Sequence, residues 1–87
     1  MKNAFILKDN IYSFKKVNVD VYIKACRLLD TTFTRLNMIM NEGDLEALMA
    51  IMYCSLRDNK GMTFDTFKQI DIEEFELLST LFKQVNE

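Results

Sequence analysis

The sequence predicts a mainly α-helical (α+β) fold in a single domain, with a β-hairpin over residues 1–16 and a helical part over residues 18–87. From Tyr22 to the end of the chain, apolar residues recur at intervals of three and four, which is the period of a helix. Before them, two short runs containing β-prone residues flank a polar pair. The chain has no proline and two glycines, so we expect three main helices and a short helical turn without a flexible linker.

The predicted hairpin pairs Asn3–Lys8 with Ile11–Lys16 through a two-residue turn at Asp9–Asn10. Both turn residues tolerate the left-handed backbone conformations that tight hairpin turns require. Phe5 and Leu7 should share one face of the hairpin, since side chains alternate along a strand. An isolated hairpin is marginally stable in water. We therefore expect it to pack on the helices, or to extend its open edge with strands from another subunit.

The first main helix is expected to begin after Asn18, whose side chain can accept hydrogen bonds from the free amides of the first turn. One apolar stripe follows the spacing of a helix and should face the core. It consists of Tyr22, Cys26, Leu29, Phe33, Leu36 and Met40. Thr31, Thr32 and Thr34 interrupt this helix with β-branched residues of lower helix propensity, which allow a kink or an early stop near residue 34.

The central helix is expected to run from Asp44 to about Arg57, and its residues up to Leu56 are almost all apolar or small. These apolar side chains cover nearly the whole circumference of the helix, whereas a surface helix shows a single stripe. We therefore predict that this helix is buried between the first and last helices.

The last third of the chain predicts a short helical turn and a final helix. Thr63 is a candidate cap for the short turn, and Asp71 with Glu74 resembles the capping box of the final helix. The apolar face of the final helix should pack beside the central helix. It contains Ile72, Phe75, Leu78, Phe82 and Val85.

The composition argues against several classes of function. The net charge is −2 with both signs mixed along the chain, so no basic stripe for a nucleic acid is expected. The apolar runs are far shorter than the roughly 20 residues that cross a bilayer, so no membrane partner is expected.

The chain has no histidine, and Cys26 and Cys54 are far apart and belong to no paired-cysteine motif. We expect free thiols in a reducing cytosol, no metal and no cofactor.

No catalytic constellation is apparent either. The acidic cluster from Asp71 to Glu76 lies in the first turns of a helix, where carboxylates are expected for capping and dipole reasons. The stretch Asp58–Phe67 resembles half of a calcium-binding loop, but lysine, methionine or phenylalanine falls on positions that need oxygen ligands. We therefore predict that the protein is not an enzyme.

Methionines are concentrated in the middle third of the chain, and flexible thioethers suit surfaces that accept several related apolar segments. Three consecutive apolar residues on a helix cannot all face one core, so at least one of Met38, Ile39 and Met40 should be exposed or meet a partner. Met49 and Met52 fit core packing better, because they lie on the all-apolar helix. The candidate partner-binding residues are Met38, Ile39, Met40, Met49 and Met52.

Three stretches together resemble the tail assembly chaperones of long-tailed bacteriophages and prophages, particularly those of Gram-positive hosts. NIYSFKKVNVDVYIKACRLLD is similar to the family's short β segment leading into a first helix. EGDLEALMAIMYCSLRDNKG is similar to its central helix, with an acid, an apolar run and an aromatic before a polar turn. MTFDTFKQIDIEEFELLSTLFKQVN is similar to its closing pattern, a Thr-capped turn followed by an amphipathic helix.

The resemblance implies a non-catalytic function. Members of this family bind the long, helical, apolar tape measure protein in the host bacterial cytoplasm, and keep it from aggregating until tail-tube subunits polymerise around it. They leave before the virion is complete. Some self-associate, and many are also made in a longer, frameshifted form. The expected partners are thus the tape measure protein, the tail-tube protein and further copies of the chain.

Two other functions are compatible with the sequence. Consecutive helices joined by short turns can form a DNA-binding helix-turn-helix, although the central helix has no Lys, Arg, Asn or Gln before Arg57. Alternatively, the chain is a structural protein that assembles with itself. A small domain buries a modest fraction of its surface, which favours added burial against a partner or another copy.

Overall fold

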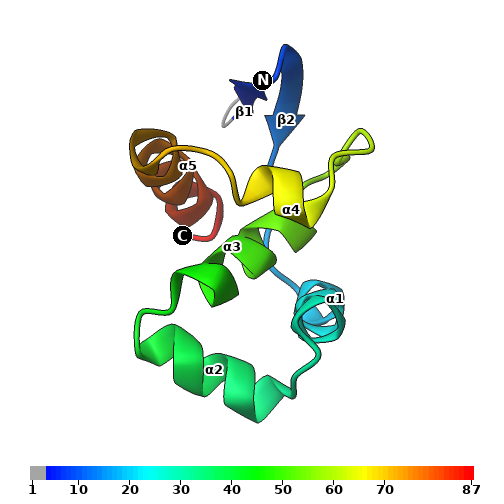
Figure 1. Ribbon diagram of the computed structural model, residues 1–87, viewed down its shortest axis with the longest axis vertical. Coiled ribbons are helices and arrows are strands. Elements are labelled where there is room, and N and C mark those ends of the chain that lie inside the picture. Colours follow the sequence, from blue (N-terminus) through cyan, green and yellow to red (C-terminus); the bar gives the residue numbers. More distant parts are fainter. Residues whose placement is uncertain (1–3) are drawn as a thin grey trace.

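The computed structural model describes residues 4–87 and has a two-stranded hairpin followed by five helices (Figure 1). The mainly α-helical fold with an N-terminal β-hairpin is confirmed, while the predicted start of the hairpin at residues 1–3 lies outside the described residues. The elements in chain order are β1 (Ala4–Leu7), β2 (Asn10–Ser13), α1 (Val19–Leu29), α2 (Phe33–Asn41), α3 (Leu45–Cys54), α4 (Phe64–Phe67) and α5 (Ile72–Val85).

The hairpin turn lies one residue earlier than predicted. Lys8 and Asp9 form it with φ angles of 48° and 67°, and Asn10 pairs with Leu7 as the first residue of β2. The Asn10 side-chain amide donates to the Lys8 carbonyl at 3.4 Å, so it supports the turn from the strand. This register places Phe5 opposite Tyr12 and leaves the residues after Ser13 free to pair elsewhere. The predicted sharing of one face is confirmed, because Leu7 and Tyr12 are buried and Phe5 packs against the core.

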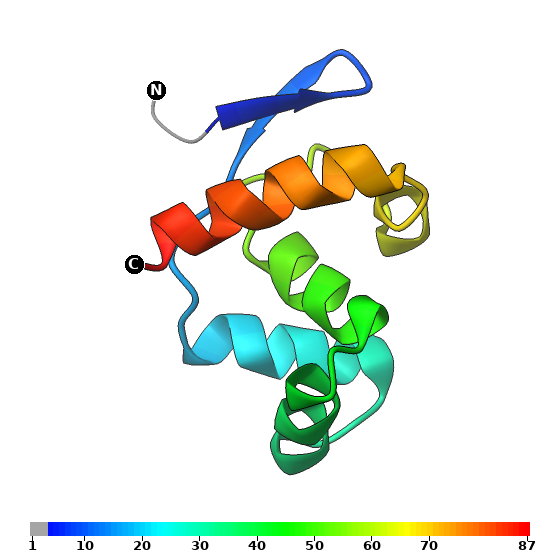
Figure 2. The ribbon, with the colours of Figure 1, turned by 90° about the vertical axis from the view of Figure 1, so that its left-hand side faces the viewer.

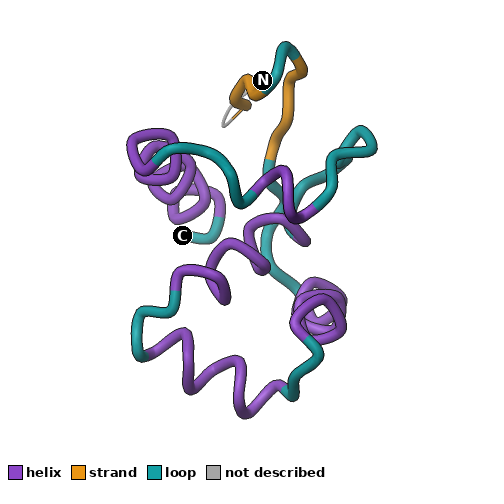
Figure 3. Tube along the Cα trace, in the orientation of Figure 1, coloured by secondary structure: helices purple, strands orange, loops and turns teal. Residues whose placement is uncertain are grey.

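The first main helix is two helices. Asp30 ends α1 in the left-handed conformation at φ 52°, which a short polar side chain tolerates. The Thr31 amide donates to the Cys26 carbonyl at 2.9 Å, and the Thr32 hydroxyl then accepts from the Arg35 amide at 3.2 Å to begin α2. The prediction of one continuous helix to Met40 was therefore wrong. The hydrogen bonds of the Thr31 and Arg35 amides satisfy these backbone groups in a turn, so the helix does not need to continue. Figure 3 shows this connection as a short loop between α1 and α2.

Helix α3 is the centre of the helical part, and its predicted packing against the first helical region is confirmed, whereas the predicted packing beside the final helix is not among its main contacts. The Asp44 carboxylate accepts from the Ala47 amide at 2.9 Å and begins the helix. Its sides contact α1, α2 and α4. The buried residues of the helix are Ala47, Met49, Ala50, Ile51 and Met52. The prediction of burial on every side was too strong, since Leu48 is half-buried and Leu45 is 54% exposed.

Helix α3 ends at Cys54 rather than near Arg57, because the next residues pair with the hairpin. The Lys15 amide donates to the Ser55 carbonyl at 2.8 Å, and the Arg57 amide donates to the Ser13 carbonyl at 3.0 Å. Phe14 and Leu56 lie opposite each other between these bonds as an antiparallel bridge. We call the pairing of residues 13–15 with residues 55–57 the hairpin bridge.

Helices α4 and α5 complete the core. The Thr63 hydroxyl accepts from the Thr66 amide at 3.1 Å, and the Asp71 carboxylate accepts from the Glu74 amide at 2.8 Å. These bonds confirm the cap at Thr63 and the Asp71 half of the predicted capping box. Helix α5 runs between the hairpin and α3 (Figure 2). The cap of its last turn, Asn86, reaches back to the segment before α1, where its Oδ1 accepts from the Val17 amide at 2.8 Å.

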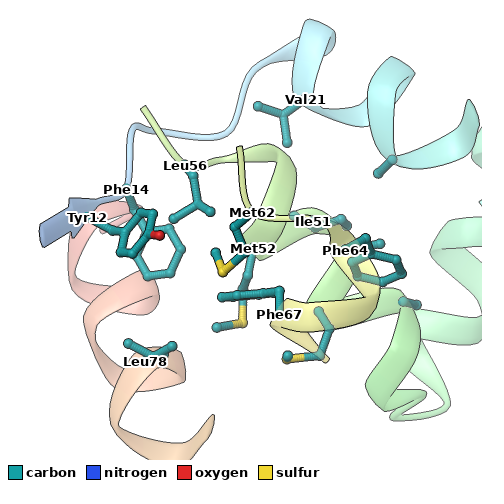
Figure 4. Close-up of a cluster of buried hydrophobic side chains, with 14 of the residues drawn as sticks. Tyr12, Phe14, Val21, Ile51, Met52, Leu56, Met62, Phe64, Phe67 and Leu78 are labelled. Atoms are coloured by element: carbon teal, nitrogen blue, oxygen red, sulfur yellow. The ribbon is translucent and has the colours of Figure 1, made fainter. Parts of the chain in front are cut away.

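The core lies where the hairpin, α3, α4 and α5 meet (Figure 4). The Phe14 ring is 2% exposed and packs edge-on against Phe82 of α5, with ring centroids 5.4 Å apart. Phe67 of α4 and Met52 of α3 are fully buried in the same cluster. One continuous core thus joins the hairpin to the helical part.

The central position of α3 predicts a contrast between two substitutions in the same helix. Ile51→Ala removes a side chain that is 1% exposed, and should lower the free energy of unfolding by about 2 to 5 kcal/mol. Leu45→Ala removes a side chain that is 54% exposed, and should change it by about 0.5 kcal/mol or less. Urea unfolding followed by circular dichroism measures both, and equal losses would contradict the central role of α3.

Candidate functional site

A groove of about 840 Å³ is formed by α1, α2 and the residues that flank α1. We call it the α1–α2 groove. It is lined by Val17, Asn18, Val19, Tyr22, Ile23, Cys26, Arg27, Asp30, Thr31, Phe33 and Asn37. Its volume lies within the range of about 300 to 1,000 Å³ that is usual for ligand-binding clefts.

The most deeply buried residues of α1 are not those of the predicted stripe. Val21 and Ala25 are the fully buried residues of α1. Tyr22 and Cys26 of the predicted stripe are half-buried, pack against the core and also line the groove. Of the stripe, Leu36 alone is fully buried, whereas Leu29 and Met40 pack against the core from half-buried positions.

Three exposed apolar side chains border the groove. Val19 and Ile23 of α1 are 75% and 44% exposed, and Phe33 of α2 is 55% exposed. Phe33 packs edge-on against Tyr22, with ring centroids 5.2 Å apart, so an aromatic pair joins the two helices across the groove. Exposed apolar residues scattered singly are normal, but residues gathered around one hollow are typical of interaction surfaces.

The charges of the groove are few and balanced. Arg27 and Asp30, which have opposite signs, are its only charged lining residues. Asp20 and Lys24 form an ion pair of 3.0 Å on α1 and do not line the groove. The hydrogen bond from Lys24 lowers the pKa of the Asp20 carboxyl below its usual value. The groove therefore favours an apolar surface over a strongly charged one.

The methionine-rich residues predicted to bind a partner do not line this groove. Met38 is 47% exposed on α2, while Ile39 and Met40 are half-buried against the core. This confirms that the three consecutive apolar residues do not all face one core. Met49 and Met52 are 6% and 0% exposed, so both pack in the core and are inaccessible in the folded chain.

Sequence reasoning missed the α1–α2 groove, although one signal was present. Val19 and Ile23 are apolar residues outside the predicted stripe, so together with Tyr22 and Cys26 they make α1 apolar over more than one face. A helix with two apolar faces has more apolar surface than a single core contact covers. The depth of the groove depends on the break at Asp30, which the sequence did not locate.

A second hollow of about 420 Å³ lies between β1 and α5. We call it the β1–α5 groove. It is lined by Phe5, Ile6, Leu7, Glu74, Leu77, Leu78, Thr80 and Leu81. Ile6 and Leu77 are each 68% exposed, so this groove is also bordered by apolar side chains that the fold leaves uncovered.

Neither groove contains a recognisable catalytic or metal-binding set of side chains. Over residues 4–87, no group of three or more His, Cys, Asp or Glu side chains is placed to hold a metal ion. Within the same residues, every helix is too short or too polar to cross a bilayer.

Comparisons of the chain with models of protein families, with curated proteins and with solved structures find no match.

The two free cysteines lie in different surroundings, and this predicts different reactivities. Cys26 borders the α1–α2 groove, whereas burial raises the pKa of the Cys54 thiol at the end of α3. A higher pKa leaves less of the reactive thiolate at a given pH. In a Cys26→Ser chain, alkylation of Cys54 by iodoacetamide should therefore need a higher pH in the folded protein than in urea. Mass spectrometry measures the rates, and identical pH profiles would contradict the burial of Cys54.

Proposed function

We propose that the protein is a non-catalytic chaperone of phage or prophage tail assembly, which holds an apolar helical segment of a tape measure protein in its α1–α2 groove. The single observation that carries this proposal is the groove, with its three exposed apolar side chains and its balanced charges. The binding takes place in the cytoplasm of the bacterial host, before the tail-tube protein assembles around the tape measure.

The shape of the groove suits the helix-in-groove mode of recognition. In that mode, an amphipathic helix inserts apolar side chains spaced three, four and seven residues apart into a hydrophobic groove. Val19 and Ile23 are one helical turn apart on α1, and Phe33 faces the groove from α2. Together they offer contacts along both walls to successive turns of a bound helix.

The resemblance of the chain to tail assembly chaperones supports the identity of the partner. It extends over three stretches that contain β2, α1, α3, α4 and α5. A tape measure protein is long, helical and apolar, so it presents many related segments of the kind that the groove accommodates. Such segments differ in sequence, and a binding site made of a few apolar and aromatic side chains is tolerant of these differences.

The proposal predicts that polar substitutions in the groove weaken binding without unfolding the protein. Ile23→Gln and Phe33→Gln each remove an exposed apolar contact. Each should raise the Kd about tenfold, which corresponds to a loss of about 1.4 kcal/mol of binding free energy. Binding is measured by fluorescence anisotropy with a labelled amphipathic helix whose leucines follow the three-four spacing. The same variants should fail to keep a co-expressed tape measure fragment soluble.

Leu28→Gln provides the matched control. Leu28 also lies on α1 and is 40% exposed, close to the 44% of Ile23, but it does not line the α1–α2 groove. This variant should bind the helical peptide like the native chain. Equal weakening by Leu28→Gln and Ile23→Gln, or unchanged binding in both groove variants, would contradict the proposed site.

A further inference from the structure

We propose that the open edge of β1 is a second docking site, which binds an extended, basic segment of a partner protein by adding it to the hairpin as a third strand. The inference goes beyond the proposed function, since it concerns another face of the molecule and another backbone conformation of the ligand. It rests on three features: the direction of the backbone groups of β1, the β1–α5 groove and the charge of α5.

The direction of the backbone groups follows from the hairpin bridge. Residues opposite each other in an antiparallel pair alternate between exchanging hydrogen bonds and pointing their polar groups outward. The Ser13 carbonyl accepts a hydrogen bond from the Arg57 amide, so it points away from β1. Ala4 and Ser13, which lie opposite each other, therefore do not exchange backbone hydrogen bonds. Ile6 and Ile11 form the pair two residues further along, so they too do not exchange backbone hydrogen bonds with each other. The amide and carbonyl of Ile6 thus point to the outer edge of β1.

That edge has no strand beside it among residues 4–87, where β1 and β2 form a two-stranded sheet. An open edge is a template for a further strand, because its backbone groups are spaced to match one. The bound segment must then be extended, since a helix satisfies its own backbone groups and has none to offer. The backbone of β1 therefore selects the conformation of the ligand.

The β1–α5 groove lies along the same edge. Consecutive strand residues point to opposite faces, yet Phe5, Ile6 and Leu7 all line this groove. A hollow that three consecutive residues line runs along the strand rather than under one of its faces. Leu77 and Leu81 of α5 form the opposite wall. A strand added to β1 can therefore insert every second side chain between β1 and α5.

The charge of α5 selects basic residues in the ligand. Glu74 lines the groove, and Glu73 lies one helical turn before Leu77 on the same side of α5. Glu76 adds a third carboxylate to this half of the helix. The ion pairs of the described residues use other carboxylates, namely Asp20, Glu46 and Asp65. The three glutamates are thus available to lysine or arginine side chains of a bound strand, beside a groove whose other lining residues are apolar except for Thr80.

The test uses a labelled eight-residue peptide of alternating valine and lysine, capped at both ends. We expect it to bind the native chain, to slow amide hydrogen exchange at Ile6 at least tenfold, and to shift the NMR signals of the Leu77 and Leu81 methyl groups. A peptide with N-methyl groups on alternate amides cannot form the edge bonds, and should bind at least tenfold more weakly. Replacing its lysines with glutamates should have a similar effect.

Two proline variants distinguish the loss of a hydrogen-bonding group at the edge of β1 from general destabilisation of the hairpin. Ile6→Pro removes the outward amide of β1, and Ile11→Pro removes the outward amide of the facing residue on β2, so the strain on the hairpin is matched. Ile6→Pro should lose peptide binding, whereas Ile11→Pro should retain it. If both proline variants unfold the hairpin, the N-methylated peptide still decides the question on the native chain.

Three results would overturn the proposal. One is equal binding of the plain and N-methylated peptides, which would show that the backbone edge is not used. Another is the absence of protection at Ile6. The third is a native chain that pairs with itself through β1, seen as a dimer by light scattering that Ile6→Pro abolishes, because the edge would then belong to a second copy. None of these results bears on the α1–α2 groove, so the proposed function is tested separately.

Discussion

The hairpin bridge is the constraint on which the rest of the structure depends. Two backbone hydrogen bonds of 2.8 and 3.0 Å join residues 13–15 to residues 55–57, although these segments are about half the chain apart. The bridge ends α3 at Cys54 and places Phe14 over the core, where its ring meets Phe82 of α5. Since the hairpin alone would be marginal, this one junction anchors it and positions both the outer edge of β1 and the face of α5 beside it.

The sequence allowed prediction of features that depend on neighbouring residues. The caps at Asn18, Asp44, Thr63 and Asp71 all form as expected, because each needs one side-chain oxygen and the amides of the next turn. The threonines allowed a kink or an early stop near residue 34, but the break at Asp30 was not located, since Asp30 and Thr31 do not by themselves decide between a helix and a left-handed turn. The hairpin bridge could not be predicted at all, because it is made of hydrogen bonds between backbone groups, which every residue type except proline can form.

The candidate site shows the same limit. The run of three consecutive apolar residues from Met38 to Met40 predicted that at least one would be exposed or meet a partner, and Met38 is exposed. The α1–α2 groove depends instead on the angle at which two helices leave a three-residue connection, so it is a property of tertiary structure. The two proposals give this small domain two binding sites, the α1–α2 groove for a helical segment and the edge of β1 for an extended segment.

The bond between the Asn86 side chain and the Val17 amide has a consequence for the geometry of tethering. It holds the last turn of the chain beside Val17, which itself lines the α1–α2 groove. A polypeptide joined to Glu87 therefore leaves the molecule close to one end of that groove. A short linker would hold any apolar segment fused there at a local concentration in the millimolar range. The C-terminal residues are thus close to the groove, and the local concentration of a fused segment would fall as its linker lengthens.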